Sequence, residues 1–335
     1  MTNSKTPPVA ITLGDPAGIG PRIIFETCST LISQKRNFFF LIADFCKVKP
    51  LADKFNCPVK KIKLCDDITI NKDVLAVYDY KFNEEITPGV SNPSESENVL
   101  GMIDKAVELI LEGRASAMVT GPINKELIAS SCKISFTGHT EYLTKKFTSV
   151  KKTVMMMQAE DFRVVPLTQH IPLKSVPKYI TKKNIKETIH IVNKSLKEFW
   201  NIEHPKIYVS GLNPHSGENG IIGHEEVLEI NPALQELKSE GINVSGPFPA
   251  DSLFNKMIRK EYDVAICMYH DQALIPIKSI FFESVINVTL GLPIIRTSPG
   301  HGTAFDIVAS EKVNINPFKL SLVEAERLAK LKKRD

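Results

Sequence analysis

Short runs of apolar residues alternate along this chain with longer stretches in which apolar residues recur every three or four positions. The short runs have the length and composition of buried strands and span residues 9–13, 38–42, 117–120, 164–167, 207–209 and 264–268. The longer stretches, residues 98–112 and 185–200, have the spacing of amphipathic helices that pack one face on a core. Because strands and helices alternate, the pattern predicts an α/β protein with a mostly parallel sheet.

Turn-rich segments separate these elements. Residues 87–98 (TPGVSNPSESEN) predict a loop, and residues 211–224 (GLNPHSGENGIIGH) predict a second one that carries histidine and acidic side chains. After the first strand, Gly14, Gly18 and Gly20 allow the backbone to turn tightly before a helix. Their spacing is not GxGxxG, so the sequence leaves open whether this turn binds a ligand or only joins a strand to a helix.

The length of the chain predicts more than one core. A chain of 335 residues suits two lobes that share one framework. We expect residues 1–130 and 297–335 to form the first α/β lobe, and residues 131–296 to form the second.

The composition narrows the class of protein. The 42 basic residues nearly balance the 38 acidic ones, and no nucleic-acid-binding motif accompanies the net charge of +4. No apolar run is long enough for a membrane helix, and the N-terminus lacks the apolar segment of a signal peptide. The six cysteines form no CxxC pair and are expected to be reduced, with Cys267 in the core. We therefore expect a cytoplasmic protein that binds neither nucleic acid nor membrane.

Histidines follow several of the predicted strands. His170, His215 and His270 each come just after an apolar run. Ligands of parallel-sheet proteins bind beyond the carboxyl ends of the strands, so these side chains could converge there. Three imidazoles with an open position suit Zn²⁺ or a similar divalent ion, although a histidine at a strand end is also often structural.

Two cations stand between apolar runs near the C-terminal third of the chain. Lys278 follows His270 by eight residues, and Arg296 follows an LGLP turn. An arginine offers a planar fork for phosphate or carboxylate, and a lysine offers a point charge. Their apolar setting favours an anionic ligand over the common alternative of two surface charges.

Several of these segments together resemble the 4-hydroxythreonine-4-phosphate dehydrogenase family. The matching strings run in the family's order over most of the chain, as GDPAGIGP, TGPINK, FTGHTEYL, GLNPHSGENG, GPFPADSLF, YHDQALIPIK and NVTLGLPIIRTSPGHGTAFD. The resemblance implies a fold similar to the isocitrate and isopropylmalate dehydrogenases, with two α/β lobes and a cleft between them. It also implies a homodimer whose active site is shared between subunits.

The resemblance assigns roles to particular residues. It implies one divalent metal (Zn, Mg or Co) on His170, His215 and His270. Lys278, Asp251 and Asp271 are the candidate catalytic groups, and the sequence leaves open whether the two aspartates act as the base or as hydrogen-bond partners of the histidines. Its implied substrate contacts are His139, Thr140, Lys278, Asn287 and Arg296. NAD(P) is expected at Gly291, Pro293, His301, Gly302, Thr303 and Asp306.

The implied reaction is oxidation of 4-phosphooxy-L-threonine by NAD(P)⁺ in pyridoxine 5'-phosphate biosynthesis. Its product, 2-amino-3-oxo-4-phosphooxybutanoate, loses CO₂ to give 3-amino-2-oxopropyl phosphate. Two alternatives stay open at this point. One is a paralogous dehydrogenase of 4-phospho-D-threonate or D-erythronate, and the other is a metal- and phosphate-binding regulator without turnover.

Overall fold

The computed structural model describes residues 6–63, 68–82, 86–90, 92–133, 136–300, 302–303 and 313–332. The chain divides into two compact units, one formed by Met1–Ser149 with Leu292–Lys330 and the other by Val150–Gly291 with Leu331–Asp335. The sequence pattern placed the two junctions near residues 130 and 297. Residues 136–149 lie within the first of these units, where the hydroxyl of Tyr142 and the ammonium of Lys146 both bond the carboxylate of Asp104.

The first unit is built on parallel strands. Its strands lie side by side in the order β3 (Val59–Ile62), β4 (Leu75–Asp79), β2 (Phe39–Ala43), β1 (Val9–Thr12), β5 (Ala117–Thr120) and β12 (Arg296–Pro299). All of the recorded strand pairs in this unit are parallel. Its helices are α1 (Gly20–Ser33), α2 (Phe45–Lys54), α3 (Glu95–Leu111), α4 (Lys125–Ser131), α5 (His139–Lys146) and α11 (Asn316–Leu331).

The second unit is mixed. Its strands lie in the order β11 (Ile286–Leu290), β6 (Val154–Ala159), β7 (Phe162–Pro166), β10 (Val264–Cys267), β8 (Ile207–Ser210) and β9 (Val244–Phe248). The strand β6 runs antiparallel to both β11 and β7, whereas the pairs from β7 to β9 are parallel. The sequence did not predict these antiparallel pairs.

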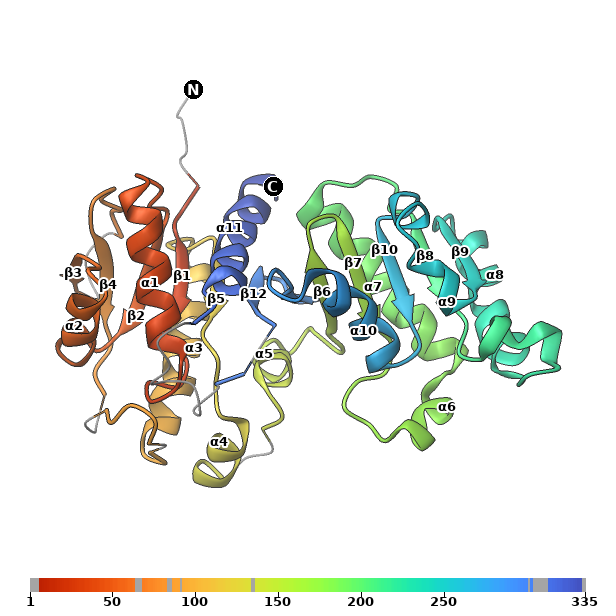
Figure 1. The fold of residues 1–335 in the computed structure, drawn as a ribbon, viewed down its shortest axis with the longest axis horizontal. Helices are drawn as coiled ribbons and strands as arrows, with labels where there is room; N and C mark the ends of the chain where they lie inside the picture. The colour runs from red at the N-terminus through yellow and green to blue at the C-terminus, as the bar shows by residue number, and fades with distance from the viewer. Residues whose placement is uncertain are drawn as a thin grey trace. The chain divides into compact units, whose positions relative to one another are not determined.

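Helices and short helical turns connect the strands of the second unit. They are η1 (Leu173–Ser175), α6 (Val176–Tyr179), α7 (Lys182–Trp200), η2 (Pro214–Gly220), η3 (Glu226–Ile230), α8 (Asn231–Ser239), α9 (Ala250–Leu253), η4 (Ile258–Lys260) and α10 (His270–Phe281). Figure 1 shows α10 on the near face of this sheet and α7 on its far face. Both faces are therefore covered, as expected for strands of continuous apolar sequence.

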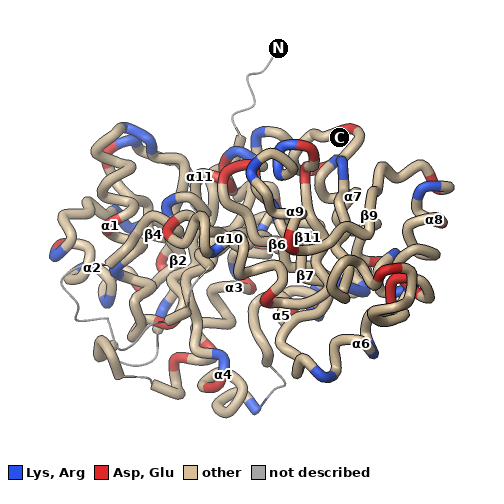
Figure 2. Tube along the Cα trace, turned by 45° about the vertical axis from the view of Figure 1, so that its right-hand side comes forward, with Lys and Arg blue, Asp and Glu red and all other residues tan. Residues whose placement is uncertain are grey.

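The apolar pattern predicted most of these elements. The strands β1, β2, β5, β8 and β10 carry no charged residue and are almost entirely buried, and in Figure 2 the charged positions lie mainly on helices and loops. The apolar stripe of α7 is buried along its whole length, and Cys267 is buried as expected. The α/β prediction with a mostly parallel sheet is confirmed.

One element was misread from its polarity. Residues 87–98 were predicted to form a loop, but α3 already begins at Glu95. Glu95 and Glu97 lie in the first helical turn, where negative charges interact favourably with the helix dipole. Polar residues there start a helix and do not interrupt one. Within the described part of the chain, no helix is long and apolar enough to cross a membrane.

The turn after β1 depends on glycine at one position. Gly14 has a φ of +76°, and a Cβ atom placed there would lie 2.4 Å from the carbonyl oxygen of Pro122. The turn thus brings the end of β1 against the segment that follows β5. Gly113, after α3, has a similar φ of +71° but open space around it.

We expect Gly14→Ala to destabilise the protein far more than Gly113→Ala. Each alanine suffers the left-handed backbone penalty of about 1 kcal/mol. The Gly14 variant must also move backbone atoms, which adds roughly 1–3 kcal/mol. Urea unfolding of both variants measures the difference in the free energy of unfolding. If both variants lost the same amount, the contact with Pro122 would not contribute to stability.

Candidate functional site

The three predicted metal-binding histidines follow three neighbouring strands of the second unit. The strands lie in the order β7, β10, β8, and His170, His270 and His215 follow them respectively. The pairs β7–β10 and β10–β8 are both parallel, so the carboxyl ends of all three strands lie at one edge. The sequence predicted that these strand ends could converge, and the strand order is the tertiary feature that such convergence requires.

Hydrogen bonds join these strand ends to one another. The hydroxyl of Thr168 donates to the carbonyl of Met268 at 2.8 Å, which fixes the segment before His170 to that before His270. The amide of Gln272 donates to the carbonyl of Gly211 at 2.9 Å and accepts from the backbone N–H of Met268 at 2.7 Å. Gln272 therefore links the ends of β8 and β10. Sequence reasoning missed this residue, although it stands inside the YHDQA string.

The rings of His170 and His270 lie together. Their centroids are 5.6 Å apart, and both rings line a hollow of about 250 Å³. The Nδ1 atom of His270 lies 2.7 Å from a carboxylate oxygen of Asp271. His270 and Asp271 also line a second hollow, of about 500 Å³, which contains Lys278. The structure thus brings four of the predicted site residues into two adjoining hollows.

His215 stands in a strained turn. The five residues His215–Asn219 all have φ between +42° and +78°, which is a left-handed conformation that only glycine adopts easily. The Nδ1 atom of His215 lies 2.6 Å from a carboxylate oxygen of Glu218. That hydrogen bond, together with the charges of Glu218 and Asp251, raises the pKa of His215. Asp251, a predicted catalytic group, thus contributes to the electrostatic environment of His215.

The chemistry of these side chains fits a divalent ion. His215 and His270 each have Nδ1 beside a carboxylate, which leaves Nε2 as the nitrogen available to a metal. Metal-binding histidines commonly have this arrangement. Among the described residues, however, no three His, Cys, Asp or Glu side chains are grouped closely enough to hold a metal ion.

The first unit contains a separate buried cluster around Arg296. The guanidinium of Arg296 is buried and donates to the hydroxyl of Thr120 at 2.6 Å. Burial lowers the pKa of Arg296 to about 9. Burial also lowers the pKa of His139 well below its ordinary value, and the positive charges of Arg296 and Lys125 lower it further. His139 is therefore neutral at pH 7, next to two cations.

The arrangement at the start of α5 is suited to an anion. His139 is the first residue of that helix, and its Nε2 atom is buried without a hydrogen-bond partner among the described residues. Thr140 follows it in the first helical turn. Lys125 was not singled out from the sequence, although it stands in the TGPINK string. Its Nζ lies 3.6 Å from the position that a Cβ on Gly138 would take.

The remaining substrate candidates lie in the second unit. Asn287 is the second residue of β11, and its side-chain oxygen is buried without a hydrogen-bond partner among the described residues. Lys278 lies in the last turn of α10 and is half-buried. An unsatisfied buried oxygen such as that of Asn287 is a feature that a bound ligand can explain.

The predicted cofactor residues divide between the units. Gly291 has a φ of +85° and donates its N–H to the hydroxyl of Ser195, and Pro293 is exposed. The carbonyl of Thr303 accepts from the N–H of Ile19 at 3.0 Å, so this residue lies against the glycine-rich turn after β1. Gly302 is exposed beside it. His301 and Asp306 lie outside the described residues.

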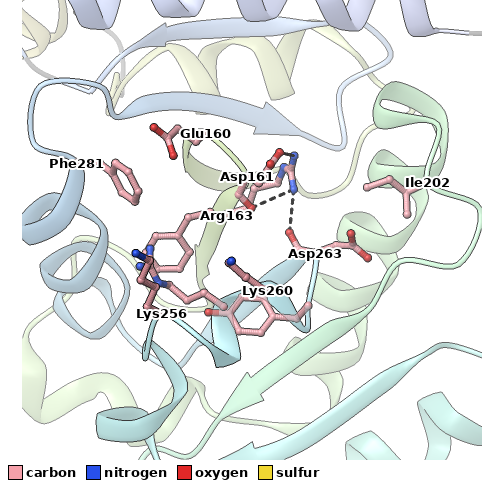
Figure 3. A pocket seen from close by; sticks show the side chains of 11 residues that line it. Glu160, Asp161, Arg163, Ile202, Lys256, Lys260, Asp263 and Phe281 are labelled. Atoms are coloured by element: carbon pink, nitrogen blue, oxygen red, sulfur yellow. Dashed lines mark hydrogen bonds and ion pairs between the residues drawn. The ribbon is translucent and has the colours of Figure 1, made fainter.

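A further hollow of about 630 Å³ contains none of the predicted site residues (Figure 3). The guanidinium of Arg163 bonds the carbonyl oxygens of Asp161 and Asp263 there. The guanidinium of Arg259 lies over the ring of Phe162, 4.8 Å from its centroid. Both guanidiniums thus have contacts within the unit.

Comparisons with known proteins match nearly the whole chain. The family described as pyridoxal phosphate biosynthetic protein PdxA matches residues 33–329. The 4-hydroxythreonine-4-phosphate dehydrogenase of Zymomonas mobilis is 41% identical over 326 residues, covering 96% of each chain. The crystal structure of the Klebsiella pneumoniae enzyme of that name aligns with a TM-score of 0.86 at 30% identity, covering 96% of this chain and 99% of the other. That of the Burkholderia phymatum enzyme gives 0.82 at 32% identity, with coverage of 99% and 100%.

The lowered pKa of His139 predicts a pH-dependent loss of stability. Below about pH 6.5 the unfolded chain takes up a proton on this histidine, whereas the folded protein does not until the pH falls to the lowered pKa. Between these two values, stability should fall by up to about 1.4 kcal/mol per pH unit. Urea unfolding at several pH values tests this, with His139→Gln as the control that lacks the titration. The prediction would be contradicted if the free energy of unfolding changed with pH in the same way in the two proteins.

Proposed function

The chain belongs to the pyridoxal phosphate biosynthetic protein PdxA family, and from that premise we propose that it oxidises 4-phosphooxy-L-threonine with NAD(P)⁺. The relatives at about this level of identity carry the name 4-hydroxythreonine-4-phosphate dehydrogenase. The product of this reaction is 2-amino-3-oxo-4-phosphooxybutanoate, which decarboxylates to 3-amino-2-oxopropyl phosphate. The enzyme thereby contributes to the formation of pyridoxine 5'-phosphate.

The buried cluster around Arg296 is the observation that carries this proposal. A buried guanidinium is suited to bind an anion, because it can donate charge-assisted hydrogen bonds in a fixed planar geometry. The unpartnered Nε2 of His139 and the side chain of Thr140 complete the proposed anion contacts. This chemistry suits the phosphate of the substrate. Lys278 and Asn287 stay predicted substrate contacts.

We propose that His170, His215 and His270 hold one divalent ion. Imidazole nitrogens suit Zn²⁺ and Co²⁺, and the family also implies Mg²⁺ as a candidate. Bound there, the ion would lower the pKa of the substrate hydroxyl and polarise the carbonyl that replaces it. Asp271 fixes the orientation of the His270 ring through its bond to Nδ1. Asp251, which contributes to the electrostatic environment of His215, is the candidate that accepts the hydroxyl proton.

The cofactor proposal rests on the segment around Thr303. Its carbonyl bonds the glycine-rich turn, and a Cβ at Gly18 would lie 3.2 Å from that same oxygen. A side chain at residue 18 would therefore press on Thr303, so glycine allows the two segments to pack this closely. NAD(P)⁺ supplies the hydride acceptor, and this part of the first unit would hold it.

Formation of NADH or NADPH from defined substrates tests the function. We expect turnover with 4-phosphooxy-L-threonine in the presence of a divalent metal. Faster turnover with 4-phospho-D-threonate or D-erythronate would assign the chain to the paralogous activity. No turnover with any of them, together with tight binding of metal and phosphate, would support a regulator.

Replacing Arg296 with alanine should weaken catalysis through the substrate. Loss of a buried charge-assisted contact to phosphate costs roughly 2–4 kcal/mol. This corresponds to a decrease in kcat/KM of about 30- to 1000-fold. The metal content should not change. The matched control is Arg163→Ala, which removes another buried arginine whose bonds go to backbone carbonyls. If titrations showed instead that Arg296→Ala binds NAD more weakly and binds the substrate as the wild type does, the role of Arg296 would be to hold the cofactor-binding segment in place.

The homodimer is proposed on the exposed face of α10. Ile275 is 62% exposed on this helix, Ile280 is 46% exposed, and the adjoining Phe282 is 78% exposed. Exposed apolar patches of this kind mark interfaces. They lie beside His270 and Lys278, so a C2 partner seated there would reach the proposed site.

Introducing a charge on this face should therefore dissociate the dimer. We expect Phe282→Asp to sediment as a monomer and to lose most of its activity. Leu111→Asp, at a similarly exposed position on α3, should remain dimeric and active. A fully active monomeric Phe282→Asp protein would refute the shared site.

A further inference from the structure

The turn that carries His215 needs an external support. Its left-handed residues include His215, Ser216, Glu218 and Asn219, none of which is glycine. L-amino acids with side chains disfavour this conformation, and a run of them persists only where surrounding contacts enforce it. The bond between His215 and Glu218 lies inside the turn and cannot anchor it to the rest of the unit.

A buried carboxylate provides this anchor. One oxygen of Glu226 accepts hydrogen bonds from the backbone N–H groups of Leu212 and Asn213, each at 2.8 Å. The other oxygen accepts from the side-chain amide of Asn213, also at 2.8 Å. The residue is 1% exposed, and no ion pair to it is recorded in the described part of the chain. Its charge is therefore balanced by N–H groups of the segment that leads into the turn.

The turn closes tightly around this carboxylate. A Cβ on Gly217 would lie 2.7 Å from one oxygen of Glu226, and a Cβ on Gly211 would lie 3.0 Å from the other. Glu226 thus touches the backbone both before and within the left-handed run. It opens η3, a π-helical turn, which is a rare geometry found mostly at functional sites.

We propose that Glu226 is the positioning residue that holds the left-handed turn and thereby aims the imidazole of His215. This inference rests on the proposed metal-binding role of His215. Glu226 acts through the segment that leads into the turn, because the hydrogen bonds recorded for its carboxylate in the described part of the chain come from Leu212 and Asn213. Neighbouring Glu225 shares the side-chain amide of Asn213 with Glu226. Its other recorded bond is to the N–H of His224, so Glu225 does not hold the backbone N–H groups of Leu212 and Asn213 that Glu226 holds.

The test uses Co²⁺ binding to the metal-free, full-length protein together with amide hydrogen exchange. Glu226→Gln keeps the shape but loses the charge, and Glu226→Ala removes the acceptors altogether. We expect faster exchange at the amides of Leu212 and Asn213 in both variants. Co²⁺ affinity should fall roughly 10–100-fold in Glu226→Ala, as for other residues that orient metal ligands, and less in Glu226→Gln. Glu225→Gln is the matched control and should bind Co²⁺ as the wild type does.

A double-mutant cycle with His215→Ala separates positioning from general stabilisation. If Glu226 acts through His215, Glu226→Gln should not weaken Co²⁺ binding further in the His215→Ala background. An equal loss of Co²⁺ affinity in both backgrounds, or an equal loss in Glu225→Gln, would overturn the proposal.

Should Glu226→Ala fail to fold, the Glu226→Gln variant alone decides the outcome. If His215→Ala itself leaves Co²⁺ affinity unchanged, the proposed metal site fails. If amide hydrogen exchange at Leu212 and Asn213 were unchanged in the Glu226 variants, Glu226 would not hold the turn, whatever the Co²⁺ titrations show.

Discussion

The structure depends on parallel strands that are covered on both faces. Such strands satisfy their backbone N–H and C=O groups within the sheet and leave no room for unpaired polar side chains between the covering helices. Polar chemistry therefore gathers where the strands end. In the second unit this places His170, His270 and His215 after three adjacent strands, β7, β10 and β8. The order of the strands, which differs from their order in the sequence, is what makes these residues neighbours.

The two units supply different chemistry. The first offers buried positive charge, in which Arg296 and a neutral His139 lie beside the start of α5. The second offers imidazoles oriented by carboxylates, with Asp271 on His270 and Glu218 on His215. Buried cations favour phosphate, and carboxylate-oriented imidazoles favour a divalent ion. The proposed oxidation requires a bound phosphate and a bound divalent ion, and each unit carries side chains suited to one of them.

Several positions show where a reading of local pattern fails. Glu95 looked like part of a polar loop, yet it begins α3, because acidic residues at a helix start and in a loop have the same polarity. Residues 136–149 were assigned to the second lobe, but Tyr142 and Lys146 bond Asp104, a partner that periodicity cannot reveal. Glu226, Gln272 and Lys125 stand inside or close to recognisable strings and were missed, because their roles depend on the groups that folding brings to them.

The sequence by itself determined the α/β class, the family and most of the strands and long helices. The class and the elements follow from spacing along the chain, since a strand or an amphipathic helix buries its own apolar residues at a fixed period. The family was identified from the resemblance of several sequence motifs that occur in the family's order. The sequence also placed the candidate histidines after their strands. Only the tertiary structure decided that His170 and His270 come within 5.6 Å, that His139 and Arg296 share one buried cluster, and that Glu226 closes the His215 turn. These outcomes depend on burial or on contacts between residues far apart in the sequence. A periodic pattern of apolar residues predicts neither of them.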